Sequence, residues 1–202
     1  MSPFELLQET PRPYLDPVEL KSKFLKLSAP LHPDRVHHLS SEEKNEANRR
    51  FSELNAAYLI LRDPRERINL LIELETGSKP KDIQRIPPGT MDLFVEVGEF
   101  CRSLDSFLAG LNSSEGSPLL KVAAMRKQQE WLSKLQKIQE KVSDKHTCSL
   151  EELQKLDAEW LSQPNHQAIL EGLENLGRLF SYIARWNSQL DERALALKSM
   201  AL

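Results

Sequence analysis

Apolar side chains recur every three or four residues along most of the chain, which is the spacing of one face of an α-helix. Before residue 77 the pattern predicts four helices, at residues 3–8, 16–31, 40–62 and 63–76. Three of these segments open with Ser or Asp followed by Pro, which is typical of a helix start. The third opens with Ser40 and Glu43, which can form a capping box.

The second and third of these helices carry the clearest apolar stripes, and we expect them to pack as an antiparallel hairpin. Pro30 should end or bend the first arm of this hairpin, because proline cannot continue the helix. The expected core positions are Leu20, Phe24, Leu27 and Leu31 on the first arm and Ala47, Phe51, Leu54, Tyr58 and Leu61 on the second.

The second half of the chain is also predicted to be helical, and no segment has the period of two that a strand requires. Helices are expected to start at Thr90, at Ser117 with Pro118, and at Ser149 with Glu152, the last ending before Pro164. A final helix carries a stripe from Ile169 to Ala194. Spacings sustained over many turns favour a bundle. We expect domains at 1–77 and 89–202, joined by a Pro-containing linker at 78–88.

Composition and charge exclude several classes of function. The chain has 202 residues and a formal net charge of −3, which gives no overall attraction to nucleic acid or anionic membranes. No window is apolar enough for a transmembrane helix, and no signal or transit peptide is evident, so we expect the cytoplasm, bacterial rather than an organellar matrix. Two cysteines, Cys101 and Cys148, are too few for a disulfide framework or a four-cysteine metal site, so neither a metal nor another cofactor is expected.

The tripeptide His32-Pro33-Asp34 lies between the two arms of the hairpin and is the main candidate for function. Pro33 fixes its own φ and biases His32 away from helix, so a turn should display an imidazole and a carboxylate. A purely structural alternative is a helix stop with Asp34 as the next cap. A metal site with His37 and His38, or a catalytic His32–Asp34 pair, lacks the further ligands or nucleophile it would need.

With this motif, residues 4–75 resemble a J domain. The similar segments are Phe24–Leu27, leading to Leu31-His32-Pro33-Asp34-Arg35, and Leu54–Tyr58 followed by Leu61–Pro64. The resemblance implies a co-chaperone, not an enzyme, that docks on the ATPase of an HscA- or DnaK-class chaperone. The residues it implies for docking are His32, Pro33, Asp34, Arg35, Lys23 and Lys26. Many J domains have basic residues where this chain has Ser28, Ala29 and Pro30.

The organisation after the J domain narrows the resemblance. Gly/Phe-rich and zinc-binding segments are absent, and the segment 63–71 ending at Gly77 resembles HscB-type co-chaperones of iron–sulfur cluster assembly. This resemblance implies an all-α fold in which an N-terminal J domain is joined by a short linker to a C-terminal three-helix bundle. In that family the bundle delivers the cluster scaffold protein to the chaperone. The alternatives are a J protein for a different client and a non-chaperone helical adaptor with a degenerate J domain.

A candidate scaffold-binding face follows from helix geometry. With about 100° per residue, Met91, Phe94 and Val95 fall nearly opposite the stripe that starts at Leu93 and Val97. Apolar residues off the core face need a partner, although packing against the linker or the J domain is an alternative. The resemblance adds the remaining scaffold-binding candidates, so that the full predicted set is Met91, Phe94, Val95, Glu96, Glu99 and Tyr182. Asp92 and Gly98 depart from the family pattern.

Overall fold

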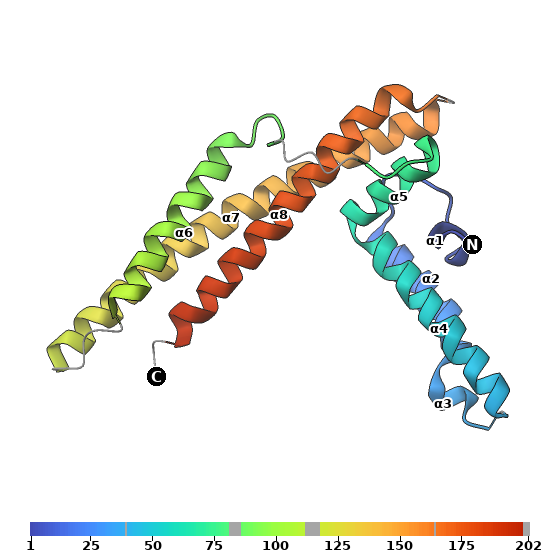
Figure 1. Ribbon diagram of the computed structural model, residues 1–202, viewed down its shortest axis with the longest axis horizontal. Helices are drawn as coiled ribbons and strands as arrows, with labels where there is room; N and C mark the ends of the chain where they lie inside the picture. The colour runs from blue at the N-terminus through green and yellow to red at the C-terminus, as the bar shows by residue number, and fades with distance from the viewer. Residues whose placement is uncertain (39, 81–85, 112–117, 164, 200–202) are drawn as a thin grey trace. The chain divides into compact units, whose positions relative to one another are not determined.

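The computed structural model describes residues 1–38, 40–80, 86–111, 118–163 and 165–199, and within these ranges the only regular elements are helices (Figure 1). No helix in the described ranges is long and apolar enough to cross a bilayer. The chain forms two compact units, and each is built from two separate stretches of sequence. Unit 1 comprises Met1–Ile83 and Glu152–Gly177, and unit 2 comprises Gln84–Glu151 and Arg178–Leu202.

The N-terminal stretch of unit 1 is a helical hairpin with short flanking helices (Figure 1). Its elements are α1 (Pro3–Leu6), α2 (Pro17–Ser28), the 3₁₀ turn η1 (Ala29–Leu31), α3 (Pro33–Val36), α4 (Ser41–Arg62) and α5 (Pro64–Thr76). The two arms, α2 and α4, lie side by side as the apolar stripes predict. Proline ends α2 as expected, because the chain tightens into η1 around Pro30 before the motif.

The predicted helix starts are confirmed in detail. Ser2 and Ser40 form capping boxes with Glu5 and Glu43, in which each serine hydroxyl accepts from the glutamate N–H. The carboxylates of Asp16 and Asp63 accept the first free N–H groups of α2 and α5. The stop after α5 is also confirmed, since Gly77 has φ +71°. The first helix is shorter than predicted and ends at Leu6 instead of residue 8.

The hairpin is held together by apolar contacts between its arms. Leu20 of α2 and Leu54 and Leu61 of α4 are buried, and Phe24 stacks on Tyr58 with ring centroids 4.5 Å apart. Burying one such side chain contributes roughly 1.5–3 kcal/mol. The α2–α4 packing therefore fixes where the turn between the arms lies.

The second stretch of unit 1 is the end of α7 (Pro118–Ser162) and the start of α8 (Gln167–Ser199). Asp157 of α7 is buried and accepts hydrogen bonds from Arg12 Nε at 2.9 Å and from the Tyr14 N–H at 3.0 Å. Arg67 of α5 is also buried and donates to the carbonyl oxygens of Pro13, at 2.7 Å, and Leu61. These bonds attach the segment after α1 to both α5 and α7.

One predicted helix start is wrong. A new helix was expected at Ser149 with Glu152, but α7 runs without interruption from Pro118 to Ser162. The Ser149 hydroxyl is buried and donates to the Lys145 carbonyl at 2.7 Å. Serine can bond back to the preceding turn inside a helix as well as cap one, so the Ser–Glu spacing alone did not mark a start.

Unit 2 brings α6 (Met91–Leu111) together with α7 and α8, which is the predicted three-helix arrangement (Figure 1). The described core residues that the three helices share are Val97, Phe100 and Leu104 from α6, Leu135, Ile138 and Val142 from α7, and Phe180, Ile183, Trp186, Leu190 and Leu197 from α8. Residues 81–85 of the predicted linker lie outside the described residues. The division into domains at residues 1–77 and 89–202 stays a prediction.

Candidate functional site

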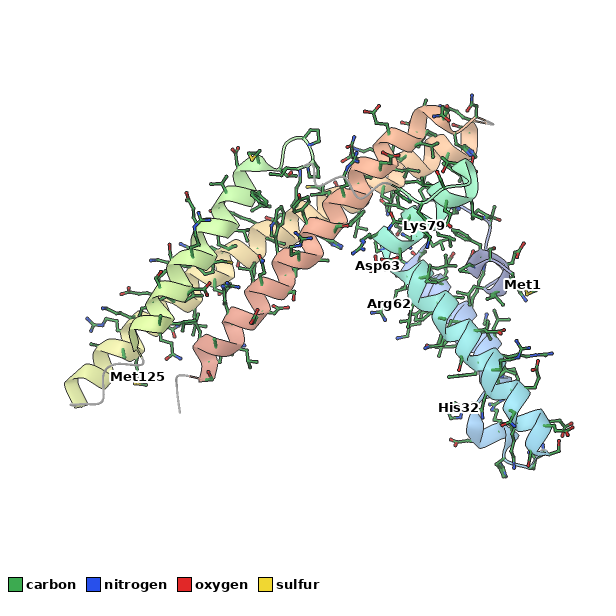
Figure 2. The ribbon with its side chains drawn as sticks, viewed as in Figure 1. Met1, His32, Arg62, Asp63, Lys79 and Met125 are labelled. Carbon is green, nitrogen blue, oxygen red and sulfur yellow. The ribbon has the colours of Figure 1, made fainter. Side chains whose placement is uncertain are left out.

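The His-Pro-Asp motif lies at the tip of the hairpin, where His32 stands between η1 and α3 (Figure 2) and Pro33 and Asp34 are the first two residues of α3. His32 has the extended backbone expected of a residue before proline and is the N-cap of α3, which begins at Pro33. Its Nδ1 accepts the Asp34 N–H at 3.3 Å. The cap of this turn is therefore His32, and the alternative in which Asp34 caps the next helix is wrong.

This hydrogen bond has a chemical consequence for the imidazole. Because Nδ1 accepts, the neutral ring carries its proton on Nε2, which then serves as a donor. The His32 side chain is 52% exposed and that of Asp34 is 88% exposed. The Phe51 ring of α4 and the imidazole meet edge to face, with centroids 6.3 Å apart. The tip thus presents two groups to a partner: the Nε2–H donor of an oriented imidazole and the exposed carboxylate of Asp34.

The cations near the tip differ in availability. Lys23 is occupied, since its Nζ lies 2.8 Å from a Glu9 carboxylate oxygen and 3.3 Å from the Gln8 carbonyl oxygen. Lys26 and Arg35 are exposed and form no ion pair within the part of the chain that the structure describes. Of the three predicted docking cations, the structure leaves these two open to a partner.

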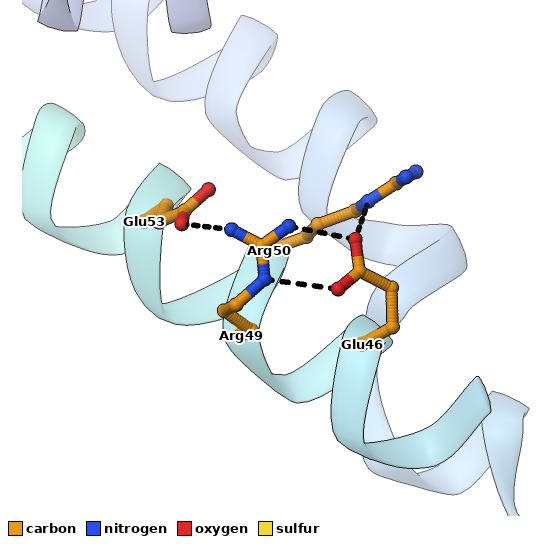
Figure 3. Close-up of polar contacts among 4 residues, drawn as sticks. All are labelled: Glu46, Arg49, Arg50 and Glu53. Carbon is orange, nitrogen blue, oxygen red and sulfur yellow. Dashed lines mark hydrogen bonds and ion pairs between the residues drawn. The ribbon is translucent and has the colours of Figure 1, made fainter. Parts of the chain in front are cut away.

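Arg49 and Arg50 of α4 are also occupied, by carboxylates on the same helix (Figure 3). Arg49 donates to both Glu46 oxygens at 2.8 and 2.9 Å and pairs with Glu53, while Arg50 Nε donates to Glu46 at 2.7 Å. These hydrogen bonds lower the pKa of Glu46 to about 2. All four side chains are exposed, so the cluster adds little stability, but it neutralises the basic charge of this part of α4.

The histidines after the motif make local contacts. His37 Nδ1 lies 2.7 Å from the Asp34 carbonyl oxygen, and the His37 and His38 rings meet edge to face. Among the residues the structure describes, no three His, Cys, Asp or Glu side chains are grouped so that they could hold a metal ion. Cys101 is buried, which raises the pKa of its thiol, and Cys148 is exposed.

The predicted scaffold-binding residues lie in unit 2. Met91, Phe94 and Val95 of α6 are 54%, 38% and 45% exposed, and the Phe94 ring meets Tyr182 of α8 edge to face at 5.9 Å. The outward angle calculated from the sequence therefore holds, and Phe94 and Tyr182 connect the two helices. We call Met91, Phe94, Val95 and Tyr182 the α6–α8 face.

The two acidic residues of the predicted set lie on the flank of α6 that faces α7, beside the α6–α8 face. Glu96 pairs with Lys141 of α7, and Glu99 is exposed. Both line a groove between α6 and α7 with Phe100, Ser103, Trp131, Lys134, Lys137, Ile138 and Lys141. The sequence interpretation missed the α7 side of this groove, although lysines at 134, 137 and 141 carry a helical spacing that indicates a common side.

Residues 4–70 match the family model of the DnaJ domain. A co-chaperone protein HscB homolog of Haemophilus ducreyi is 25% identical over 142 residues, covering 64% of this chain and 82% of that protein. An HscB homolog of Mannheimia succiniciproducens is 35% identical over 78 residues, covering 39% of this chain and 45% of that protein.

Solved structures agree on the fold. The chaperone HscB from Vibrio cholerae has a TM-score of 0.51 at 22% identity and covers 94% of this chain and 99% of its own. The human co-chaperone protein HscB has a TM-score of 0.54 at 19% identity, covering 100% of this chain and 84% of its own. At these identities the structures support the fold alone, while the sequence matches relate the chain to co-chaperones.

Proposed function

We propose that this chain, a J-domain co-chaperone of the HscB type, stimulates ATP hydrolysis by an HscA- or DnaK-class chaperone. The geometry of the hairpin tip carries the proposal. His32, Pro33 and Asp34 lie at this tip, and the His32 imidazole is oriented and half exposed. The match of residues 4–70 to the DnaJ domain supports the same partner class. Homologues from bacteria support a bacterial cytoplasm as the location.

In the proposed mechanism the chain performs no covalent chemistry. It binds one conformation of the chaperone ATPase better than the others and so shifts that protein's equilibrium toward hydrolysis. His32 Nε2 and the Asp34 carboxylate supply directional hydrogen bonds, while Lys26 and Arg35 attract an acidic surface and raise the association rate. Because only these two of the three predicted cations are unpaired in the described part of the chain, docking should depend strongly on each.

We further propose that the α6–α8 face binds an iron–sulfur cluster scaffold protein and that Glu96 and Glu99 contribute at its edge. Exposure of three apolar side chains on α6 supports a partner there, because a free apolar patch costs solubility. The Phe94–Tyr182 contact makes the patch continuous across two helices. Asp92 and Gly98 interrupt the apolar character of α6, which leaves a different client as the second candidate.

The test measures the ATPase rate of an HscA-class chaperone with this protein, with and without the scaffold. Wild type should stimulate alone and stimulate further with scaffold. Val95→Glu should keep the first effect and lose the second. Leu195→Glu is the matched control, because Leu195 is 71% exposed on α8 outside the face. Stimulation that the scaffold does not increase would contradict scaffold delivery and favour the different client. Absence of any stimulation would contradict the proposed co-chaperone function.

A further inference from the structure

The groove between α6 and α7 has an apolar floor of large side chains. Phe100 and Ile138 are buried, and Trp131 is half-buried between the Phe100 and Phe107 rings, with centroids 5.8 and 5.5 Å away. An open groove with an aromatic floor is suited to an apolar side chain from another molecule. This floor is separate from the α6–α8 face, which lies across α6.

The α7 wall of the groove is basic. Lys134, Lys137 and Lys141 follow one another at spacings of three and four, and all three line the groove. Lys134 Nζ lies 4.7 Å from the centroid of the Trp131 ring, over its face. Residues 126–145 contain six basic and three acidic residues, although the whole chain has a net charge of −3. Positive charge is thus concentrated on this length of α7.

The acidic wall offsets only part of that charge. Glu96 of α6 is already paired with Lys141. Glu99 remains, opposite the two exposed lysines 134 and 137, and Lys137 has no ion-pair partner among the described residues. An incoming carboxylate would meet two lysines with one competing acid, whereas an incoming cation would have to displace Lys141 or approach the lysine row. Charge complementarity therefore favours an acidic occupant.

We infer that this groove is a second docking subsite for the scaffold protein, which inserts an acidic amphipathic segment into it. An apolar side chain of that segment packs on Trp131 and Ile138, and its carboxylates pair with Lys134 and Lys137. The inference rests on the proposed scaffold-binding function. It extends the contact over α6, because Val95 and Glu99 lie about 40° apart around the helix axis. A partner that straddles α6 would touch both surfaces.

The test measures scaffold binding to the full chain by isothermal titration calorimetry. The double variant Lys134→Glu/Lys137→Glu should weaken binding by about tenfold or more, since reversing charges across an interface replaces attraction by repulsion. It should also flatten the dependence of the affinity on salt. Arg126→Glu/Lys127→Glu is the control, because it makes the same change in net charge at exposed α7 positions outside the groove. Unchanged thermal melts would show that both variants fold.

Each outcome has a defined meaning. Weaker scaffold binding by Lys134→Glu/Lys137→Glu than by Arg126→Glu/Lys127→Glu supports the subsite. Equal loss in both double variants would show a general charge effect and overturn it. Unimpaired binding by the groove variant, together with loss in Val95→Glu, would overturn the subsite but retain scaffold binding. No binding by the wild-type chain would overturn the scaffold function and the subsite with it.

Discussion

At the scale of single residues, the sequence identifies the motif but not the state of its neighbours. His32, Pro33 and Asp34 could be placed at a turn because proline restricts both itself and the residue before it. The occupation of Lys23 by Glu9 and Gln8 could not be predicted, because these residues are far from Lys23 along the chain and meet it only through tertiary packing. Asp157 of α7 is buried, and a buried acid needs a partner. The sequence interpretation missed that this residue would contact another segment of the chain.

The difference between the two α2 lysines gives a direct test of docking. Lys26→Ala should weaken stimulation of the chaperone several-fold more than Lys23→Ala, because Lys23 Nζ is already held by Glu9 and an exposed cation is the one that steers a partner. The measurement is the co-chaperone concentration that gives half-maximal ATPase stimulation, taken at two salt concentrations. A larger effect of Lys23→Ala would contradict this assignment of the docking cations.

The capping box of α4 gives a prediction about pH. Hydrogen bonds from Ser40 lower the pKa of Glu43 from its ordinary value of 4.5. A lowered folded-state pKa contributes stability that is present above the unfolded pKa and is lost as the pH falls through the folded pKa. NMR titration of the Glu43 carboxyl should therefore show a midpoint below 4.5 that moves upward in Ser40→Ala. An identical midpoint in the two proteins would contradict the capping box in solution.

At the scale of helices, local sequence chemistry predicted starts and stops better than it predicted continuity. Ser2, Asp16, Ser40 and Asp63 cap helices as their spacing indicates, and Gly77 ends α5. These signals depend on hydrogen bonds within a few residues. The false start at Ser149 and the unexpected helix α3 show the limit of these signals, because a serine can cap a helix or bond inside one and a proline after a turn can begin a helix.

Two helical glycines should respond differently to replacement by alanine. A Cβ on Gly98 of α6 would meet only the Arg102 guanidinium, at 3.6 Å, whereas a Cβ on Gly172 of α8 would lie 3.2 Å from a methyl of Leu156. Gly98→Ala should raise the free energy of unfolding by about 0.5–1 kcal/mol, and Gly172→Ala should give no gain or a loss. Urea unfolding measures both. Stabilisation by Gly172→Ala equal to that by Gly98→Ala would contradict the packing described for α8.

At the scale of the whole molecule, no sequence signal indicated that the N-terminal hairpin shares a compact unit with residues 152–177. The all-helical class followed from periodicity, which is a local property, whereas the three-helix bundle was expected from the resemblance to HscB-type co-chaperones. The attachment through Asp157 depends on residues more than a hundred positions apart, Arg12 and Tyr14 among them. His166 adds to it, since it stacks on Trp160 and its Nδ1 lies 3.3 Å from a Glu75 oxygen.

Hydrogen exchange can test whether this discontinuous unit opens as one. Asp157→Ala should remove the acceptor for Arg12 and Tyr14 and leave their donors unpaired, at a cost of about 1–3 kcal/mol. Amides of α5 and of residues 153–173 should then lose protection together, while those of α6 should not change. Faster exchange confined to residues 153–173 would instead favour separate folding of residues 1–77 and 89–202.

If the His-Pro-Asp tip activates a chaperone ATPase, a single-turnover ATPase assay with an HscA- or DnaK-class chaperone should reveal it. Wild type should accelerate hydrolysis, His32→Gln should abolish the acceleration, and His37→Gln should retain it, because the one hydrogen bond of the His37 side chain within the described residues is to the Asp34 carbonyl. His32→Gln should melt at nearly the wild-type temperature, since the side chain is half exposed. Full acceleration by His32→Gln would show that the tip does not activate the ATPase.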